Sequence, residues 1–283
     1  MRAIIFTDLD GSLLDHEDYS FAAATQSLDR IKRSGIPLIM TTSKTRREVE
    51  LLQREIGIRE PFIVENGGGI FFPPGYRGLP IEHGGPRDGY TVVTLGTTYP
   101  RVRAFLERAR VRFDLRGFGD MEVAEIAART GLSAERAALA KEREFTEPFL
   151  MERPEEIEAL SAFATADGFK VTRGGRFFHL TGGEQDKGKA VRTAYEIISR
   201  GSGALPTSIG IGDSENDLAM LAAVDIPVLI PRPGKGPLDM NLPGLIRAVR
   251  TGAGGWNDAV LRILDERMGP PEEDAPERQA IGE

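Results

Sequence analysis

The sequence contains no cysteine, three histidines and one tryptophan among its 283 residues. The absence of cysteine excludes disulfides, thiolate catalysis and cysteine-ligated metals. Three scattered histidines are too few for a histidine-rich zinc site. The longest apolar run, Leu218 to Val224, is far shorter than the roughly 20 residues of a membrane span, and Asp8 interrupts the N-terminal apolar run before a signal peptide could form. We therefore expect a cytoplasmic protein with no membrane partner.

Charge and length narrow the class of protein further. The chain has 36 basic and 43 acidic side chains, a net charge of -7 and an isoelectric point near 5.3. Proteins that bind nucleic acid neutralise phosphates with an excess of basic residues, so we expect no nucleic-acid partner. The length fits one or two domains.

Apolar strands alternate with amphipathic helices at both ends of the chain, which predicts an α/β core with a doubly wound, Rossmann-like parallel sheet. The expected strands span 3–7, 36–42, 61–64, 208–211 and 226–230, and the expected helices span 22–33, 46–56, 187–200, 215–223 and 256–267.

The middle of the chain has a different pattern, which predicts an inserted α+β cap. Its expected strands are 90–95, 148–152, 168–171 and 176–180, and its expected helices are 100–110, 134–142 and 154–166. We therefore assign 1–83 and 184–267 to the core and 84–183 to the cap. Residues 268–283 carry three prolines and five acidic side chains and are expected to form a mobile tail.

Acidic residues follow two of the expected core strands. Asp8 and Asp10 end the first strand, and two positions apart on a strand they point to the same side. A second acidic stretch, Gly212 to Asp217, ends a later strand. Carboxylates gathered at one edge need a hard cation such as Mg²⁺ to offset their repulsion. The alternatives are a solvated turn at Asp8 to Gly11 and a helix N-cap at Asp213 or Ser214.

Phosphate-binding groups are expected at the same edge. Thr42, Ser43 and Lys44 follow the second strand and open a helix, where hydroxyls and backbone amides can hold a phosphate oxygen. Lys187 opens another helix, a position that the helix dipole disfavours for a cation, and a bound anion would explain it. The alternatives are helix capping by Thr42 or Ser43 and a solvated surface lysine at 187.

Four segments in this order, with the insert between the second and third, resemble the haloacid dehalogenase superfamily with a type C2 cap. They are Asp8 to Ser12, Thr42 to Lys44, Lys187 to Gly188 and Gly212 to Asp217. Ser12 stands where many members have threonine, and it keeps the hydroxyl. Within the superfamily, segments 42–45, 65–69, 143–149 and 174–180 are similar to the mannosyl-3-phosphoglycerate phosphatases. The resemblance covers about residues 1–265.

The resemblance implies a Mg²⁺-dependent phosphatase of a small phosphorylated glycoside. Asp8 would be the nucleophile, Asp10 the general acid and base, and Lys187 a further catalytic residue. The implied metal site comprises Asp8, Asp10 (through its carbonyl), Asp213, Ser214 and Asp217, with Asn216 and Asp217 orienting it. The candidate substrate-binding residues are Thr42, Ser43, Lys44, Asn66, Arg143, Thr146, Glu147, Arg176 and His179.

In the cap, Arg176 suits bidentate capture of a glycerate carboxylate, and Thr146 and Glu147 could bond sugar hydroxyls. Other readings remain open at this stage. The substrate could be glucosyl-3-phosphoglycerate, sucrose phosphate or another sugar phosphate, the enzyme could be a sugar-phosphate mutase, and a non-enzymatic phosphoaccepting signalling domain would place similar residues at strand ends.

Overall fold

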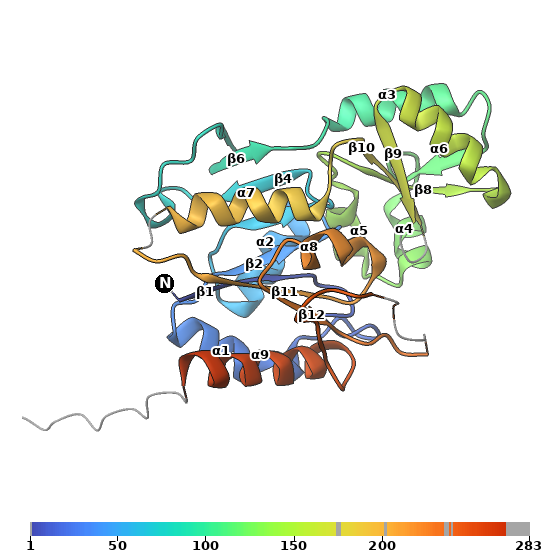
Figure 1. Cartoon of the computed structure of the whole chain (residues 1–283). Coiled ribbons are helices and arrows are strands. Elements are labelled where there is room, and N and C mark those ends of the chain that lie inside the picture. The colour runs from blue at the N-terminus through green and yellow to red at the C-terminus, as the bar shows by residue number, and fades with distance from the viewer. Residues whose placement is uncertain (1, 174–176, 201–202, 235–237, 239, 270–283) are drawn as a thin grey trace, which may run out of the picture.

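A mostly parallel sheet forms the centre of the core domain (Figure 1). The computed structural model describes residues 2–173, 177–200, 203–234, 238 and 240–269. Within them the sheet has nine strands, in the order β13 (Ile246–Arg247), β12 (Ile226–Leu229), β11 (Thr207–Gly212), β1 (Ala3–Thr7), β2 (Leu38–Thr41), β3 (Phe62–Val64), β4 (Gly69–Phe72), β6 (Tyr90–Thr94) and β5 (Gly85–Arg87). The run from β13 to β3 is parallel, as expected.

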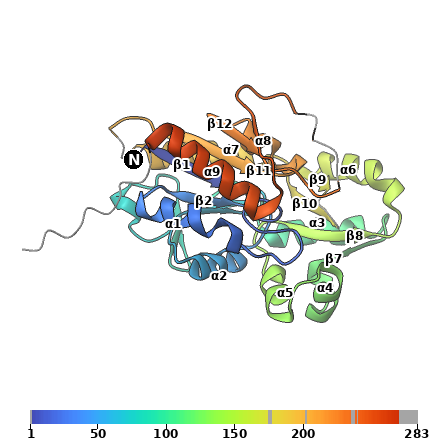
Figure 2. The ribbon, with the colours of Figure 1, turned by 90° about the horizontal axis from the view of Figure 1, so that it is seen from below.

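Helices cover both faces of this sheet, so its central strands are largely apolar. All five residues of β1 are buried, and they alternate between the two faces. Ile5 packs in the cluster formed with α1 (Thr25–Arg33), α2 (Arg46–Ile56) and α9 (Gly252–Met268), whereas Ile4 and Phe6 pack in the cluster formed with α7 (Lys187–Ser199) and α8 (Leu218–Leu221). Figures 1 and 2 show α7 on one face of the sheet and α1 and α9 on the other.

The antiparallel edge of the core sheet differs from the expected domain boundary. We expected the cap to start at residue 84, but β5 and β6 pair with each other and with β4 in the core sheet. The alternating pattern at 90–94 correctly indicated a strand, yet such a pattern does not say which sheet the strand joins. The chain therefore leaves the core sheet only after Thr94.

The cap is a separate four-stranded antiparallel sheet with helices on both faces (Figure 1). Its strands, in spatial order, are β7 (Leu115–Gly117), β8 (Glu147–Met151), β10 (Phe178–Gly182) and β9 (Phe169–Arg173). Phe149 of β8 packs in the cluster formed by α3 (Tyr99–Ala109) and α6 (Ile157–Ala166), whereas Leu150 contacts the cluster of α4 (Val123–Thr130) and α5 (Ala134–Lys141). Neither β7 nor α4 was expected from the sequence.

Two remaining expectations concern the membrane and the end of the chain. Among the described residues, no helix combines the length and the apolar character needed to cross a membrane. α9 begins at Gly252, four residues before the expected start at Trp256. The expected tail lies outside the described residues from 270 onward.

Candidate active site

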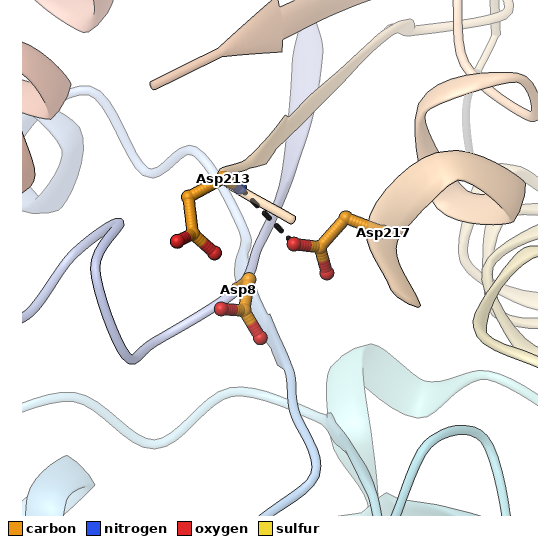
Figure 3. Close-up of side chains that lie close together, drawn as sticks. All are labelled: Asp8, Asp213 and Asp217. Atoms are coloured by element: carbon orange, nitrogen blue, oxygen red, sulfur yellow. Dashed lines mark hydrogen bonds between the residues drawn. The ribbon is translucent and has the colours of Figure 1, made fainter. Parts of the chain in front are cut away.

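Three buried carboxylates meet at the carboxyl ends of two adjacent parallel strands. Asp8 follows β1 and Asp213 follows β11, its parallel neighbour. Asp217 comes from the short 3₁₀ turn that begins at Glu215. One oxygen from each of the three side chains lies within 4.8 Å of the others (Figure 3). The strand pairing therefore brings the two predicted acidic loops together.

Asp217 organises the loop on which it lies. Its side chain is fully buried, and Oδ2 accepts hydrogen bonds from the backbone N–H groups of Asp213 and Ser214, each at 3.1 Å (Figure 3 shows the first). The Ser214 hydroxyl is also 3.1 Å from Oδ2. Ser214 is thus the N-cap of the 3₁₀ turn, so the predicted capping role and the acidic cluster occur in one loop.

Lys187 joins the cluster from the first position of α7. Its Nζ lies 2.6 Å from Asp8 Oδ1 and 2.7 Å from Asp217 Oδ1, and only 1% of its side chain is exposed. The helix N-terminus itself is capped by Asp186, which accepts from the Lys189 N–H. The surface-lysine alternative for Lys187 is therefore wrong, and its immediate anionic partners are carboxylates.

Burial dominates the electrostatics of this cluster. Burial raises the pKa of Asp8 well above its usual value, Asp217 raises it further, and Lys187 opposes both effects. Burial and the nearby Asp217 raise the pKa of Asp213 to about 6. For Lys187, burial lowers the pKa, but Asp217 and Asp8 outweigh it and the net change is upward. The Lys187 ammonium therefore stays charged, but its single positive charge does not balance the negative charge of the carboxylate cluster.

The donor set fits a hard divalent cation. Asp8 and Asp213 present carboxylate oxygens within 4.8 Å of each other, which is the ligand chemistry Mg²⁺ prefers. Asp217 fits a supporting role better, because its oxygens already accept from Lys187 and from the loop backbone. His16, which the sequence analysis missed, lies with Nε2 3.4 Å from Asp213 Oδ2. No spacing motif links His16 to the second acidic loop.

Asp10 faces a different cation from Asp8. Its Oδ1 lies 3.0 Å from Lys44 Nζ, and the Asp10 side chain is 39% exposed. Lys44 is partly buried, with 14% of its side chain exposed, and its Nζ also lies 3.6 Å from Glu48 Oε1. Although burial lowers the pKa of Lys44, Asp10 and Glu48 raise it by more, so Lys44 is a cation. Lys44 therefore lies next to the predicted general acid and base.

The hydroxyl loop after β2 does not cap the following helix. The N-cap of α2 is Thr45, which forms a capping box with Glu48, so the capping alternative for Thr42 and Ser43 is wrong. Thr42 is buried, and its Oγ1 accepts from the Lys44 N–H at 3.1 Å. The Ser43 carbonyl accepts from Nη1 of Arg143, a cap residue, at 3.0 Å. This loop follows β2, and β2 is the neighbour of β1 in the sheet, so the loop lies beside the acidic cluster.

The predicted cap residues have different surroundings. The Thr146 hydroxyl donates to Glu65 of the core, and the fully buried Glu147 accepts from Tyr99, Arg103 and the Gly119 N–H. Arg143 Nε and His179 Nδ1 are buried polar atoms without a hydrogen-bond partner among the described residues. Burial, aided by Arg143, lowers the pKa of His179 to about 3, so this imidazole is neutral. Arg176 lies outside the described residues.

Asn66 connects the core loops near the site. Its Oδ1 accepts from Nδ2 of Asn216, in the second acidic loop, at 3.5 Å, and its N–H donates to the Thr42 carbonyl. Asn66 and the preceding Glu65 both have positive φ, and Gly67 follows with φ 89°. A Cβ at Gly67 would lie 2.3 Å from the Asp186 carbonyl oxygen, so only glycine allows this loop to contact the start of α7.

Comparisons with known proteins show which family the chain resembles. The family profile of the haloacid dehalogenase-like hydrolases matches residues 5–76. A glucosyl-3-phosphoglycerate/mannosyl-3-phosphoglycerate phosphatase from Persephonella marina is 52% identical over 93% of this chain and 97% of its own. A protein of the same name from Methanococcoides burtonii is 42% identical over 93% of this chain and 98% of its own, and a mannosyl-3-phosphoglycerate phosphatase from Pyrococcus furiosus is 34% identical over 81% and 91%.

Solved structures share the fold at low sequence identity. A phosphatase of the haloalkanoate dehalogenase superfamily from Bacteroides thetaiotaomicron superposes with a TM-score of 0.65 at 17% identity, covering 95% of this chain and 96% of its own. The sucrose-phosphatase of Synechocystis gives 0.60 at 17% identity, covering 93% and 98%. The relatives at 52% and 42% identity show that the chain belongs to the haloacid dehalogenase-like hydrolases and that it is a phosphatase. Within that family it is a close homologue of the glucosyl-3-phosphoglycerate/mannosyl-3-phosphoglycerate phosphatases.

Proposed function

We propose that this chain hydrolyses mannosyl-3-phosphoglycerate to mannosylglycerate and phosphate, with Mg²⁺ as cofactor. The observation that carries the proposal is the 52% identity, over 93% of the chain, to a relative with that activity in its name. Glucosyl-3-phosphoglycerate is the second candidate substrate, because the names of the relatives from Persephonella and Methanococcoides include both. We treat the two as alternative or joint substrates.

In the proposed first step, a carboxylate oxygen of Asp8 attacks phosphorus. The O–P bond to Asp8 forms as the ester O–P bond breaks, and Asp10 donates a proton to the departing oxygen. Lys187 supports the attack because its ammonium opposes the effect of burial on the pKa of Asp8 and fixes one of the Asp8 oxygens. Thr42 and Ser43 would hold the phosphate oxygens while charge builds up on them.

In the second step, water attacks the phosphorus of the aspartyl-phosphate. Asp10, now ionised, takes the proton from that water, and phosphate leaves with Asp8 regenerated. Lys44 Nζ lies 3.0 Å from Asp10 Oδ1 and holds this carboxylate in place. Asp8, Asp213 and the Asp10 carbonyl would hold Mg²⁺, which would supply positive charge to offset the negative charges of the nucleophile and the phosphate.

The cap would select the substrate. Arg143 and His179 are suited to contact the glycosyl-glycerate portion, because each has a buried polar atom left without a hydrogen-bond partner among the described residues. Thr146, Glu147 and Arg176 remain predicted contacts to the same portion of the substrate. Discrimination between mannosyl and glucosyl groups depends on the direction of one hydroxyl.

The test is phosphate release from a panel of substrates by purified protein, with Mg²⁺ and with chelator. The panel comprises mannosyl-3-phosphoglycerate, glucosyl-3-phosphoglycerate, sucrose 6-phosphate and p-nitrophenyl phosphate. We expect kcat/KM for a glycosyl-3-phosphoglycerate to exceed the others by at least about tenfold, the equivalent of one extra charged hydrogen bond. Faster hydrolysis of sucrose 6-phosphate, or an isomerised product without free phosphate, would contradict the proposal.

A further inference from the structure

The loop 65–69 contains a buried carboxylate to which the proposed mechanism gives no role. This residue, Glu65, directly follows β3 and has the left-handed φ of 50°. Its N–H donates to the Lys44 carbonyl at 3.0 Å, and its carbonyl accepts from Nε2 of Gln185. Lys44 ends the hydroxyl loop, and Gln185 lies two residues before Lys187. The backbone of Glu65 therefore links two segments that carry site residues.

The side chain of Glu65 crosses from the core to the cap. Oε1 accepts from the Glu144 N–H at 2.7 Å, and Oε2 accepts from the N–H groups of Phe145 and Thr146 at 3.1 and 2.8 Å. The Thr146 hydroxyl adds a fourth bond at 2.7 Å, and Arg143 Nε lies 4.0 Å from Oε2. The carboxylate is fully buried. Four donors on one carboxylate offset the cost of its burial and set its geometry.

This contact lies where the cap joins the core. The chain enters the cap after Thr94 and returns to the core after Gly182, and a Cβ on Gly182 would lie 3.2 Å from the Thr97 nitrogen. The two crossings are therefore adjacent, which leaves rotation of the cap about them as its easiest motion. The hydrogen bonds to Glu65 add a buried contact between core and cap beside the two chain crossings. A second contact between core and cap, the ion pairs of Glu144 with Arg46 and Arg87, is partly exposed.

We propose that Glu65 is a positioning residue, whose carboxylate holds cap segment 143–146 against the phosphate-binding end of the core. Arg143, at the start of this segment, donates to the Ser43 carbonyl and keeps its Nε without a hydrogen-bond partner among the described residues. Fixing the segment therefore fixes a cap cation relative to the hydroxyl loop. A substrate that spans core and cap depends on this alignment, and a small phosphate ester does not. The part concerning substrates rests on the proposed function.

Glu65→Gln tests the role of the carboxylate while keeping the backbone links. The Gln amide keeps one acceptor oxygen, but its NH₂ group replaces the other. This NH₂ group would face N–H donors of the cap segment, so at least one hydrogen bond between core and cap is lost. We expect kcat/KM for a glycosyl-3-phosphoglycerate to fall about tenfold and that for p-nitrophenyl phosphate to change by less than about twofold. Equal losses on both substrates would overturn the proposal.

Glu60→Gln is the matched control. Glu60 precedes the same strand, β3, at its opposite end, and accepts from the Tyr76 hydroxyl at 2.6 Å. Its replacement removes a half-buried carboxylate remote from the cap segment, so the ratio of the two kcat/KM values should stay at the wild-type level. A shift in this ratio equal to that of Glu65→Gln would show that any lost carboxylate has this effect, and the positioning role would be rejected.

A second measurement separates this proposal from the proposed function. Amide hydrogen exchange at residues 144–146 should accelerate in Glu65→Gln and stay at the wild-type rate in Glu60→Gln, whatever the substrate. Unchanged exchange in Glu65→Gln would overturn the proposal. Failure of the wild-type enzyme on glycosyl-3-phosphoglycerates, with accelerated exchange in the variant, would reject only the substrate.

Thr146→Val keeps the charge of Glu65 and removes one donor, so it serves if Glu65→Gln does not fold. It should accelerate amide exchange at residues 144–146, which the loss of a substrate contact would not do, and shift the substrate ratio in the same direction by about threefold, about half the free-energy effect of the loss of a charged bond. Combined with Glu65→Gln, it should add less than its single effect, because both act on one bond. Full additivity or an unshifted ratio would count against the proposal.

Discussion

Lys187→Met removes one positive charge from between two buried carboxylates and leaves an unbranched apolar side chain that is one atom shorter. Lys187 Nζ contacts Asp8 and Asp217 at 2.6 and 2.7 Å, and its side chain is 1% exposed. Removal of one partner from a buried ion pair typically costs about 3–5 kcal/mol, because the remaining charge has no compensation. We expect a loss of this size in the unfolding free energy of the metal-free protein at pH 8.

The loss should shrink at acidic pH. Burial already raises the pKa of Asp8 in the folded protein, and removal of Lys187, which opposes that effect, raises it further. In the variant the folded state therefore binds a proton more tightly than the unfolded state, so its stability falls as pH rises through the pKa of folded Asp8. The difference from wild type should grow with pH by at most about 1.4 kcal/mol per pH unit for one proton.

Denaturant unfolding with chelator at pH 5 and pH 8 measures both effects. Lys189→Met is the control, since Lys189 lies on the same helix and has no ion pair among the residues that the structure describes; it should change stability by less than about 0.5 kcal/mol. A loss for Lys187→Met below about 1 kcal/mol at pH 8, or a larger loss at pH 5 than at pH 8, would refute the charge-balance reasoning.

Three further predictions concern the nucleophile, the metal and pH. Asp8→Asn should lower turnover at least about a thousandfold with an unchanged fold by circular dichroism, and more than a few per cent of residual activity would exclude Asp8 as nucleophile. Chelation should abolish activity and Mg²⁺ should restore it, and full activity of metal-free protein would rule this out. The apparent Mg²⁺ affinity should be weaker below pH 6, because the pKa of Asp213 is about 6. The pKa of His179 in the folded protein is about 3, so between about pH 6.5 and 3 the unfolded protein binds one more proton at this residue than the folded protein does. The free energy of unfolding should therefore fall as pH falls through this window, by at most about 1.4 kcal/mol per pH unit. Parallel stability curves for wild type and His179→Gln would contradict that assignment.

The parallel half of the core could be predicted because its strands are buried on both faces. β1 has no exposed residue, so its apolar run indicates a central strand directly, and Asp8 marks its end. The antiparallel edge could not be predicted in the same way. β4 begins at Gly69, the last glycine of loop 65–69, and its pairing with β6 joins segments about 20 residues apart, which no local pattern specifies.

The acidic cluster and Lys187 were predictable, whereas the role of each side chain depended on its partners. Asp213 and Asp217 look alike in the sequence, yet Asp217 accepts from Lys187 and the loop backbone and is left with less capacity for a metal. Glu65 appeared only as part of a motif. Its hydrogen bonds go to residues 144–146, about 80 positions away, and the sequence carries no signal that pairs them.

The charges of the site also constrain the order in which its ligands bind. Asp8, Asp213 and Asp217, when ionised, carry three negative charges, and Lys187 supplies one positive charge, so one divalent cation balances the remainder. Burial and Asp217 raise the pKa values of Asp8 and Asp213, so protons compete with the cation for these carboxylates. A phosphate ester brings further negative charge, and Lys44 is already paired with Asp10. Because like charges in a buried site repel strongly, charge balance favours binding of the cation before the substrate.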